Sequence, residues 1–336
     1  MTATLDANGW LTRGEAGPSV VALGGGHGLS ATLRALRHVT RNLTAVVTVA
    51  DDGGSSGRLR QQLSCLPPGD LRMALAALCD ESEWGLTWRD VMQYRFHTDG
   101  DLNDHALGNL LITGLWELLG DSVEGLDWVA KLLGAHGRVL PMASVPLEIE
   151  ADLEWQGDVR TVRGQSKVAV AHGEVKDIRL NPAQPPVPHQ TLAAVRDADW
   201  VVLGPGSWYT SVLPHLLVND LAQQLLQTKA RRALVVNLAC QVGETENLSL
   251  AQHLGVLKTY APDLRIDVVI ADPAAVEDID ALTDAAHELG ASILLRQVRT
   301  GDGKAHHDPL RLAAAFRDAF EGFLGDVEPL RGVDMS

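Results

Sequence analysis

The feature that most constrains the fold is a glycine-rich turn between an apolar run and an amphipathic run. The stretch SVVALGGGHGLSATLRALRHV, residues 19–39, is typical of a strand, a tight turn and a helix. The stretch LTAVVTVADDGG, residues 43–54, predicts a second strand with a polar loop at its carboxyl end. A strand, a helix and a strand at this spacing form a βαβ unit, which favours a parallel sheet.

The same alternation returns in the second half of the chain. Trp200–Leu203 predicts a short buried strand, and three later apolar runs predict further strands: RRALVVNLAC, IDVVIA and SILLRQV. Helical spacing of apolar residues predicts the intervening helices at Val218–Gln227, Leu248–Tyr260, Asp278–Leu289 and Pro309–Phe323.

In the segment between these halves, the spacing of the apolar residues changes once. Residues 70–135 have apolar positions at helical spacing and predict a helical insert, whereas residues 138–180 alternate and predict a small antiparallel β excursion. We therefore expect one doubly wound, mostly parallel α/β domain over residues 19–325. Loose tails are expected at 1–18 and 326–336.

Charge and cysteine content limit the classes of function. The 336 residues include 28 basic and 43 acidic residues, a formal net charge of −15, which opposes binding to nucleic acid or to an anionic membrane. No apolar run approaches the ~18 residues of a membrane span. Cys65, Cys79 and Cys240 are odd in number and widely spaced, so we expect buried free thiols in a reducing compartment. A cytoplasmic location is therefore expected.

The first glycine turn is a candidate anion site. Glycine lets the backbone approach a ligand, and the start of the following helix offers free N–H groups to a phosphate. The turn matches neither G-x-G-x-x-G nor a P-loop, so a tight turn without a ligand is the alternative. His27 is equally well explained as a surface residue. The candidate ligand residues are Gly24, Gly25, Gly26, His27 and Gly28.

The stretch GPGSWYTS after the strand at Trp200–Leu203 repeats this pattern. Its backbone N–H groups and hydroxyls suit a phosphate, although Ser207 could instead cap the helix that follows. Trp208 could stack on a base or pack inside the protein. The candidate ligand residues are Gly204, Gly206, Ser207, Tyr209 and Thr210.

The stretch DDGGSSGR is a candidate corner for a metal and a phosphate. Asp51 and Asp52 repel each other unless a cation or hydrogen-bond donors neutralise them, and Mg²⁺ is held by one or two carboxylates plus phosphate oxygens. An Asx turn with solvated acids is the alternative. Asp70 lies in the first turn of a predicted helix, where a carboxylate suits the helix dipole. The candidate phosphate ligands here are Ser55, Ser56, Gly57 and Arg58.

Two further segments are candidates for the same cleft. In DHALGNLL, His105 and Asn109 lie on one helical face, and Gly108 costs about 1 kcal/mol against Ala unless something approaches closely. A capped helix start with a packing glycine is the alternative.

In GDGKAHHDPLRLA we expect a wall of the pocket, with a solvated capping loop as the alternative. Its candidate residues are Lys304, His306, His307 and Asp308.

These segments, in this order, resemble the YvcK-type gluconeogenesis factors, which are relatives of the CofD-type phospholactate transferases of deazaflavin biosynthesis. The matching pieces span roughly Val20 to Tyr260: GGGHGLSATLRAL, TVADDGGSSGRLR, PPGDLRMALAAL, HALGNLL and GPGSWYTSVLPHLLV, with NLACQVGETENLSLAQH matching more loosely. The factor branch implies a Rossmann-like fold, cytoplasmic binding of a UDP-sugar or other nucleotide diphosphate, and a part in gluconeogenic growth, cell shape and cell-wall precursor supply. The transferase branch implies Mg²⁺-dependent transfer of phospholactate to a deazaflavin.

The resemblance also assigns roles to residues. It implies that Asp51 or Asp52, with Asp70, serves metal and acceptor, that the two glycine turns surround the nucleotide, and that His105 and Asn109 line the same cleft. This chain departs from the family pattern by having His27 for Thr, Met73 for Asn, Ala106 for Ser and Trp208 for Leu. Met73 and Ala106 remove polar groups, which weakens an inherited catalytic role more than nucleotide binding.

Three functions remain open from the sequence. A UDP-sugar-binding regulatory factor is the first, and a phospholactate-type transferase is the alternative. An NAD(P)-binding protein, with Asp51 on a ribose, is the second alternative, but it leaves Gly53–Arg58 unexplained. No hydrolase signature is present in the sequence. We expect a nucleotide-sugar ligand, no nucleic acid and no membrane span, with further copies of the same chain as an open alternative.

Overall fold

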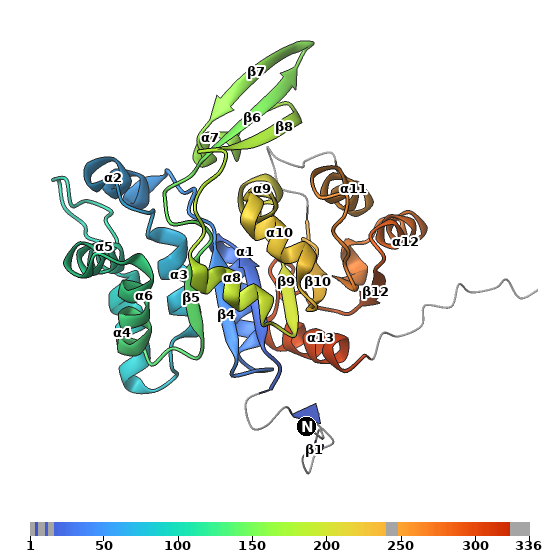
Figure 1. Cartoon of the computed structure of the whole chain (residues 1–336), viewed down its shortest axis with the longest axis horizontal. Helices are drawn as coiled ribbons and strands as arrows, with labels where there is room; N and C mark the ends of the chain where they lie inside the picture. The colour runs from blue at the N-terminus through green and yellow to red at the C-terminus, as the bar shows by residue number, and fades with distance from the viewer. Residues whose placement is uncertain (1–3, 6–10, 13–16, 240–247, 323–336) are drawn as a thin grey trace, which may run out of the picture.

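The centre of the molecule is a seven-stranded parallel sheet, shown in Figure 1. The computed structural model describes residues 4–5, 11–12, 17–239 and 248–322. The strand order is β12-β11-β10-β9-β3-β4-β5, and every neighbouring pair is parallel. This confirms the predicted doubly wound, mostly parallel α/β fold. The strands are β3 (Val20–Gly24), β4 (Leu43–Val47), β5 (Arg138–Pro141), β9 (Trp200–Leu203), β10 (Arg231–Val235), β11 (Val268–Ala271) and β12 (Ser292–Leu295).

Helices cover both faces of this sheet. Right-handed crossovers place helices on opposite faces when the strand order runs in opposite directions, as it does here from β3 to β5 and from β9 to β12. The helix contacts agree, because α1 packs against α3 and α13, whereas α8 packs against α10 and α11 against α12. The bounds are α1 (Gly26–Leu36), α3 (Gly69–Leu78), α8 (His189–Arg196), α10 (Asn219–Gln227), α11 (Leu250–Tyr260), α12 (Ile279–Glu288) and α13 (Pro309–Glu321).

The predicted helical insert is present and has one more helix in front of it. After α3 come α4 (Glu83–Gln93), α5 (Leu107–Leu119) and α6 (Ser122–Leu132). The stretch read as a loop after the second strand contains α2 (Gly54–Leu63), so Ser55, Ser56, Gly57 and Arg58 are helical residues. Weak helix formers fill its first turns, which is why helical spacing did not reveal it.

The β excursion is smaller than predicted. Residues 138–141 form β5, which pairs parallel with β4 in the main sheet, so the excursion begins only at β6. β6 (Glu148–Trp155), β7 (Asp158–Arg163) and β8 (Glu174–Asn181) form an antiparallel sheet in the order β7-β6-β8, with α7 (Gln165–Val168) between β7 and β8. This sheet projects beyond the carboxyl ends of the main strands in Figure 1, and its outer strand β7 is largely exposed.

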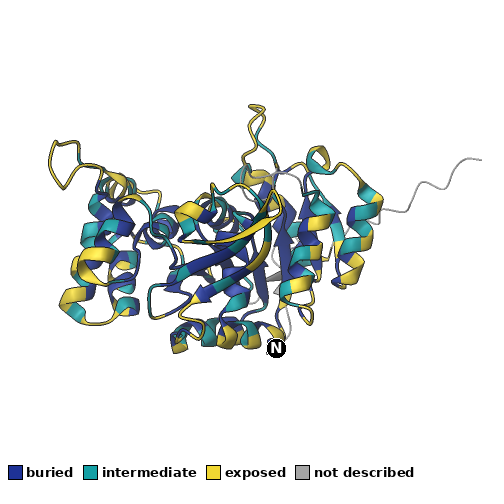
Figure 2. Cartoon of the chain, turned by 90° about the horizontal axis from the view of Figure 1, so that it is seen from above, coloured by how far each residue is buried: buried dark blue, intermediate teal, exposed yellow. Residues whose placement is uncertain are grey.

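The burial pattern in Figure 2 matches this architecture, with buried strands in the centre and exposed residues on outer helix faces. Cys65 and Cys79 are free thiols; Cys79 is buried, as predicted, whereas Cys65 is only half-buried. Cys240 and the tail at 326–336 lie outside the described residues. Of the tail at 1–18, the described part includes two short antiparallel strands, β1 (Thr4–Leu5) and β2 (Leu11–Thr12). No described helix is long and apolar enough to span a membrane.

Candidate functional site

The topology of the sheet places a candidate site at the carboxyl ends of β3 and β9. These strands are neighbours, yet the chain leaves β3 toward β4 on one side and leaves β9 toward β10 on the other. Ligands of open α/β sheets bind at such a switch point, outside the carboxyl ends of the strands. Both predicted glycine turns follow these two strands.

The two glycine turns are in direct backbone contact. A Cβ atom at Gly28 would lie 2.1 Å from the Pro205 carbonyl oxygen and 2.9 Å from the Gly206 Cα atom, so a residue with a side chain does not fit there. The Thr32 hydroxyl donates to the carbonyl of Gly204 at 3.2 Å, and Gly204 has a φ of +66°, which favours glycine. The predicted meeting of the two turns is therefore present in the structure.

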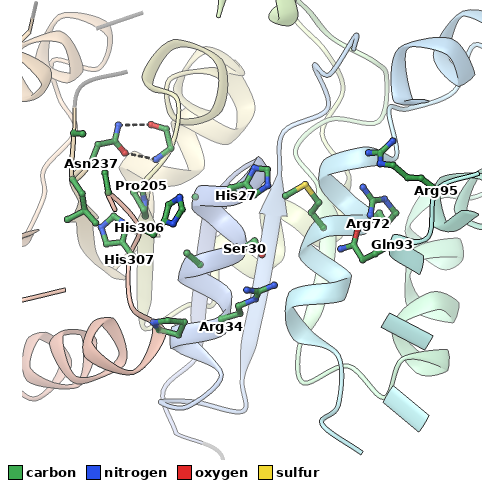
Figure 3. Close-up of a pocket in the computed structure, with 18 residues that line it drawn as sticks. His27, Ser30, Arg34, Arg72, Gln93, Arg95, Pro205, Asn237, His306 and His307 are labelled. Atoms are coloured by element: carbon green, nitrogen blue, oxygen red, sulfur yellow. Dashed lines mark hydrogen bonds between the residues drawn. The ribbon is translucent and has the colours of Figure 1, made fainter. Parts of the chain in front are cut away.

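A cavity of about 760 Å³ opens beside these turns, as Figure 3 shows. It lies between α1, α3, the segment after α4, the turn after β9 and the segment before α13. None of the described residues that line it is an Asp or a Glu. The charged lining residues are Arg34, Arg72 and Arg95, and three histidines line the cavity beside them, His27, His306 and His307. In a chain with a formal charge of −15, this local reversal of charge favours an anionic ligand.

The most deeply placed cation of the cavity is Arg72, which the sequence did not single out. Only 4% of its surface is exposed, and its Nε atom donates to the Asn109 side-chain oxygen at 2.8 Å. Burial, and secondly the charge of Arg95, lower the pKa of Arg72 to about 10. Its Nη1 atom is buried and has no hydrogen-bond partner among the described residues.

Several predicted ligand residues lie behind the cavity wall instead of in it. Ser55, His105 and Asn109 are buried and joined by hydrogen bonds, and none of them lines the cavity. The placement of His105 and Asn109 in the ligand cleft, which the resemblance implied, stays a prediction, and in this structure both residues lie behind the wall of this cavity. Arg58 donates to the backbone oxygens of Asp101 and Asn103 at 2.9 and 2.7 Å and does not line the cavity either.

Ser56 and Gly57 serve packing in this structure. Ser56 is buried, and its hydroxyl oxygen lies 2.4 Å from where a Cβ atom at Gly69 would be. A Cβ atom at Gly57 would lie 2.0 Å from the Asp52 carbonyl oxygen, so the glycine permits the tight start of α2. Neither residue is among those that line the cavity.

The hydroxyls of the second turn also serve the fold. Ser207 caps the short helix η2 (Trp208–Val212), since its side chain accepts from the Thr210 N–H at 3.2 Å. Tyr209 and Thr210 are buried and do not line the cavity. Trp208 packs inside the protein against His253, with ring centroids 5.4 Å apart. For these residues the structure shows the capping and packing alternatives.

Gly206 is held by a residue that the sequence did not identify. Its N–H donates to the Asn237 side-chain oxygen at 2.9 Å, and the Asn237 amide donates back to the Gly206 carbonyl at 2.9 Å, as Figure 3 shows. Both residues line the cavity. The available signal was an Asn two residues past the end of β10, at the edge of the sheet where a site was expected.

The three predicted metal ligands do not form one cluster. Asp52 accepts from the Ser166 N–H at 2.8 Å, and Asp51 accepts from the Gly53 N–H at 2.9 Å. Burial raises the pKa of Asp70 to about 7, and the charge of Asp51 adds to this effect. The described part of the chain holds no group of three or more His, Cys, Asp or Glu side chains able to bind a metal.

Asp70 nevertheless has one oxygen that suits a cation. Its Oδ2 atom is buried, lacks a hydrogen-bond partner within the described ranges, and lies 2.6 Å from the position of a Cβ atom at Gly25. The carboxyl group therefore lies directly beneath the first glycine turn. Mg²⁺ needs only one or two carboxylates when phosphate oxygens complete its shell, so Asp51 and Asp70 fit such an ion. Bound Mg²⁺ stays a prediction.

The segment before α13 was expected either to form a wall of the pocket or to be a solvated capping loop, and different residues of it do each. His306 and His307 line the cavity, as expected of a wall. Lys304 is exposed and does not line it, and Asp308 caps α13 by accepting from the Leu310 and Arg311 N–H groups at 2.9 and 3.0 Å. Burial lowers the pKa of His307 to about 4, so this imidazole is neutral at pH 7.

The chain is similar to known proteins of the family that its ordered motifs indicated. The family model of the 2-phospho-L-lactate transferase CofD matches residues 20–293. A relative from Mycobacterium tuberculosis is 48% identical over 317 residues, which cover 92% of each chain. The Bacillus subtilis gluconeogenesis factor is 38% identical over 262 residues, covering 78% of this chain and 80% of its own. A crystal structure of a UPF0052 family member from Bacillus halodurans has a TM-score of 0.80 at 32% identity, covering 89% of this chain and 98% of that one.

Proposed function

The chain belongs to the CofD family, which includes relatives named gluconeogenesis factor, and on that premise we propose that it is a nucleotide-sugar-binding regulatory factor. The ligand is a UDP-sugar, or another nucleotide diphosphate, in the cavity at the switch point. Its regulatory role is in gluconeogenic growth, cell shape and the supply of cell-wall precursors. The observation that carries the binding proposal is the basic lining of a cavity at the switch point of an acidic chain.

The chemistry of the cavity suits a diphosphate in two ways. The N-terminal end of α1 offers backbone N–H groups beside Gly28, and a helix N-terminus stabilises negative charge. Arg34 and Arg72 line the same cavity and are able to pair with phosphate oxygens. A volume of about 760 Å³ is within the usual range for a site that takes a small molecule.

The transferase activity remains the second candidate because of Asp51 and Asp70. An unpartnered carboxylate oxygen beneath a glycine turn is suited to hold a cation against a phosphate. Phosphoryl-group transfer depends on positioning and charge neutralisation more than on a covalent residue. Two carboxylates that hold a metal ion would therefore be sufficient to support it. Met73 lines the cavity at a position where the family pattern has Asn, which weakens an inherited catalytic role more than nucleotide binding.

Isothermal titration and thermal shift test the proposal with UDP-N-acetylglucosamine, UDP-glucose, GDP and NAD, each with and without Mg²⁺. A ligand at 100 times its Kd should stabilise the protein by about 2.7 kcal/mol. Arg34→Gln should weaken binding, whereas Arg41→Gln, an exposed position outside the cavity, removes the same charge and should not. Equal ligand affinity in both variants would show that the ligand binds outside this cavity. Product formation from a deazaflavin acceptor would instead support the transferase.

The place of the site is tested separately at the second turn. Gly206→Val adds a branched side chain to the cavity wall at a φ of +152°, so it should abolish binding while the protein stays folded. Gly303→Val is the matched control, since Gly303 also has a positive φ of +78° and a Cβ atom there meets nothing within 4 Å. Unchanged affinity in a folded Gly206→Val variant would contradict the location.

A further inference from the structure

We propose that Arg72 anchors a phosphate group in this cavity, and that Ser55, His105, Gly108 and Asn109 are positioning residues for its guanidinium. The identity of the whole ligand rests on the proposed function, whereas the phosphate subsite rests on the contacts of Arg72 alone. Two sequence motifs that looked like separate ligand contacts thus serve one side chain.

The guanidinium of Arg72 is built into the protein but incompletely bonded. Arg34 is exposed and Arg95 is half-buried, whereas Arg72 is 4% exposed and held through Nε by Asn109. Its buried Nη1 atom has no partner in the described part of the chain. A buried charge that is incompletely paired destabilises the protein, so an anion in the cavity that pairs with this guanidinium offsets the cost of burying its charge.

The hydrogen bonds around Ser55 fix the direction of the whole chain of contacts. The Ser55 oxygen accepts from the Asn109 amide at 3.0 Å and from the Ala106 N–H at 3.3 Å. Both of its acceptor positions are therefore used, and its single proton donates to Nδ1 of His105 at 3.0 Å. His105 must accept at Nδ1, so it is neutral with its proton on Nε2.

The orientation of Asn109 follows from Arg72, because an arginine Nε can only donate. The Asn109 carbonyl oxygen must therefore face Arg72, which leaves the Asn109 NH₂ group to donate to Ser55. The reversed amide would place two donors against the guanidinium. A neutral His105 and a bonded Ser55 thus hold the one amide orientation that orients Arg72.

Gly108 leaves room for the aliphatic part of Arg72. A Cβ atom at Gly108 would lie 2.8 Å from Cδ of Arg72 and 2.5 Å from the Met92 carbonyl oxygen. The start of α5 can therefore lie against the arginine only if this residue has no side chain. That close approach explains a glycine inside a helix, where it otherwise costs stability.

Phosphate fits this subsite better than a carboxylate does. Arg95 lines the same cavity, and its charge is one of the causes that lower the pKa of Arg72, whereas the charges of Asp70 and Asp51 raise that pKa. Figure 3 shows both arginines on the same side of the cavity. A phosphate carries up to two negative charges and several acceptor oxygens, which match two guanidinium groups.

Titration of inorganic pyrophosphate into the full chain tests the anchor. Arg72→Gln should weaken its binding roughly 10- to 100-fold, the range for a hydrogen bond to a charged group. Arg72→Lys should not restore it, because an ammonium lacks the planar fork. Arg41→Gln is the control for charge and should bind as the wild type does. Wild-type affinity in a folded Arg72→Gln variant would overturn the anchor.

A double-mutant cycle tests the positioning role. Ser55→Ala should weaken pyrophosphate binding roughly 10-fold in the wild-type chain but not further in Arg72→Gln, because it acts through Arg72. A full additional loss in the double variant would overturn the role. If Ser55→Ala does not fold, Ser55→Cys, which keeps the shape but replaces the hydroxyl by a weak donor and acceptor, takes its place in the cycle.

The two proposals fail in different ways. Arg72-dependent binding of pyrophosphate without any binding of a UDP-sugar would remove the proposed function and keep the subsite. Binding of a UDP-sugar that is equal in wild type and Arg72→Gln would keep the function and remove the subsite. A wild-type chain that binds neither compound would remove both.

Discussion

Substitution of Gly28 by Ala tests the contact between the two glycine turns, on which the cavity depends. The added Cβ atom would lie 2.1 Å from the Pro205 carbonyl oxygen, roughly 1.2 Å short of an ordinary carbon–oxygen contact of about 3.3 Å. The obstacle is backbone, which cannot rotate away as the end of a side chain can. Forcing an extra methyl group into a packed site costs about 1–3 kcal/mol. Against this, Ala in a helix gains up to about 1 kcal/mol over Gly.

We therefore expect Gly28→Ala to lower the free energy of unfolding by about 1–2 kcal/mol, which corresponds to a melting temperature a few degrees lower. Urea unfolding followed by circular dichroism measures the first quantity. The matched control is Gly114→Ala in α5, where a Cβ atom meets nothing within 4 Å, so the same change should raise stability. Ligand affinity should fall in Gly28→Ala only. A gain in stability equal to that of Gly114→Ala would refute the backbone contact between the turns.

Three further predictions concern the ionisable groups of the site. Burial raises the pKa of Asp70 from 3.8 to about 7, so the contribution of this group to stability is fully present below pH 4 and is lost as the pH rises through 7. Asp70→Asn should therefore raise the urea midpoint at pH 8 but not at pH 4, and an equal effect at both would contradict this cause. His307→Ala should weaken ligand binding and Lys304→Ala should not, by titration calorimetry, since only His307 lines the cavity. Ligand affinity should rise with Mg²⁺, and Asp51→Asn should reduce that rise more than Asp52→Asn. Equal ligand affinity with and without Mg²⁺ would contradict the predicted metal site.

The fold was predictable where a segment carries its own periodic signal. Trp200–Leu203 was predicted as a strand and is β9 with the same bounds, because a short apolar run after a polar stretch has few alternatives. The sequence of Arg138–Pro141 does not indicate which strand it pairs with. Its place beside β4 results from pairing with residues much earlier in the chain. Helix α2 was missed because Gly54, Ser55 and Ser56 are poor helix formers, and tertiary contacts hold this turn instead.

The site was predictable where glycines mark a close approach of the backbone and where the segment before α13 was expected to form a wall, at His306 and His307. Gly28 and Gly206 were identified from the turns that contain them, and both line the cavity. Arg72 was missed because it lies within the amphipathic stretch LRMALAAL, where an arginine reads as a surface residue. Its role depends on Ser55 and Asn109, which come from two other helices and meet it only after folding.

The adjacency of β3 and β9 has a consequence for synthesis on the ribosome. Thr32 bonds to Gly204, which lies 172 residues later in the chain, and the last wall of the cavity, at His306 and His307, is translated later still. At ordinary rates of translation the first glycine turn emerges tens of seconds before its partners. The strands β3, β4 and β5 can pair in that interval, but a nascent chain cannot form the cavity. Ligand binding is consequently a property of the finished polypeptide, and a titration of the ligand also counts the molecules that have completed folding.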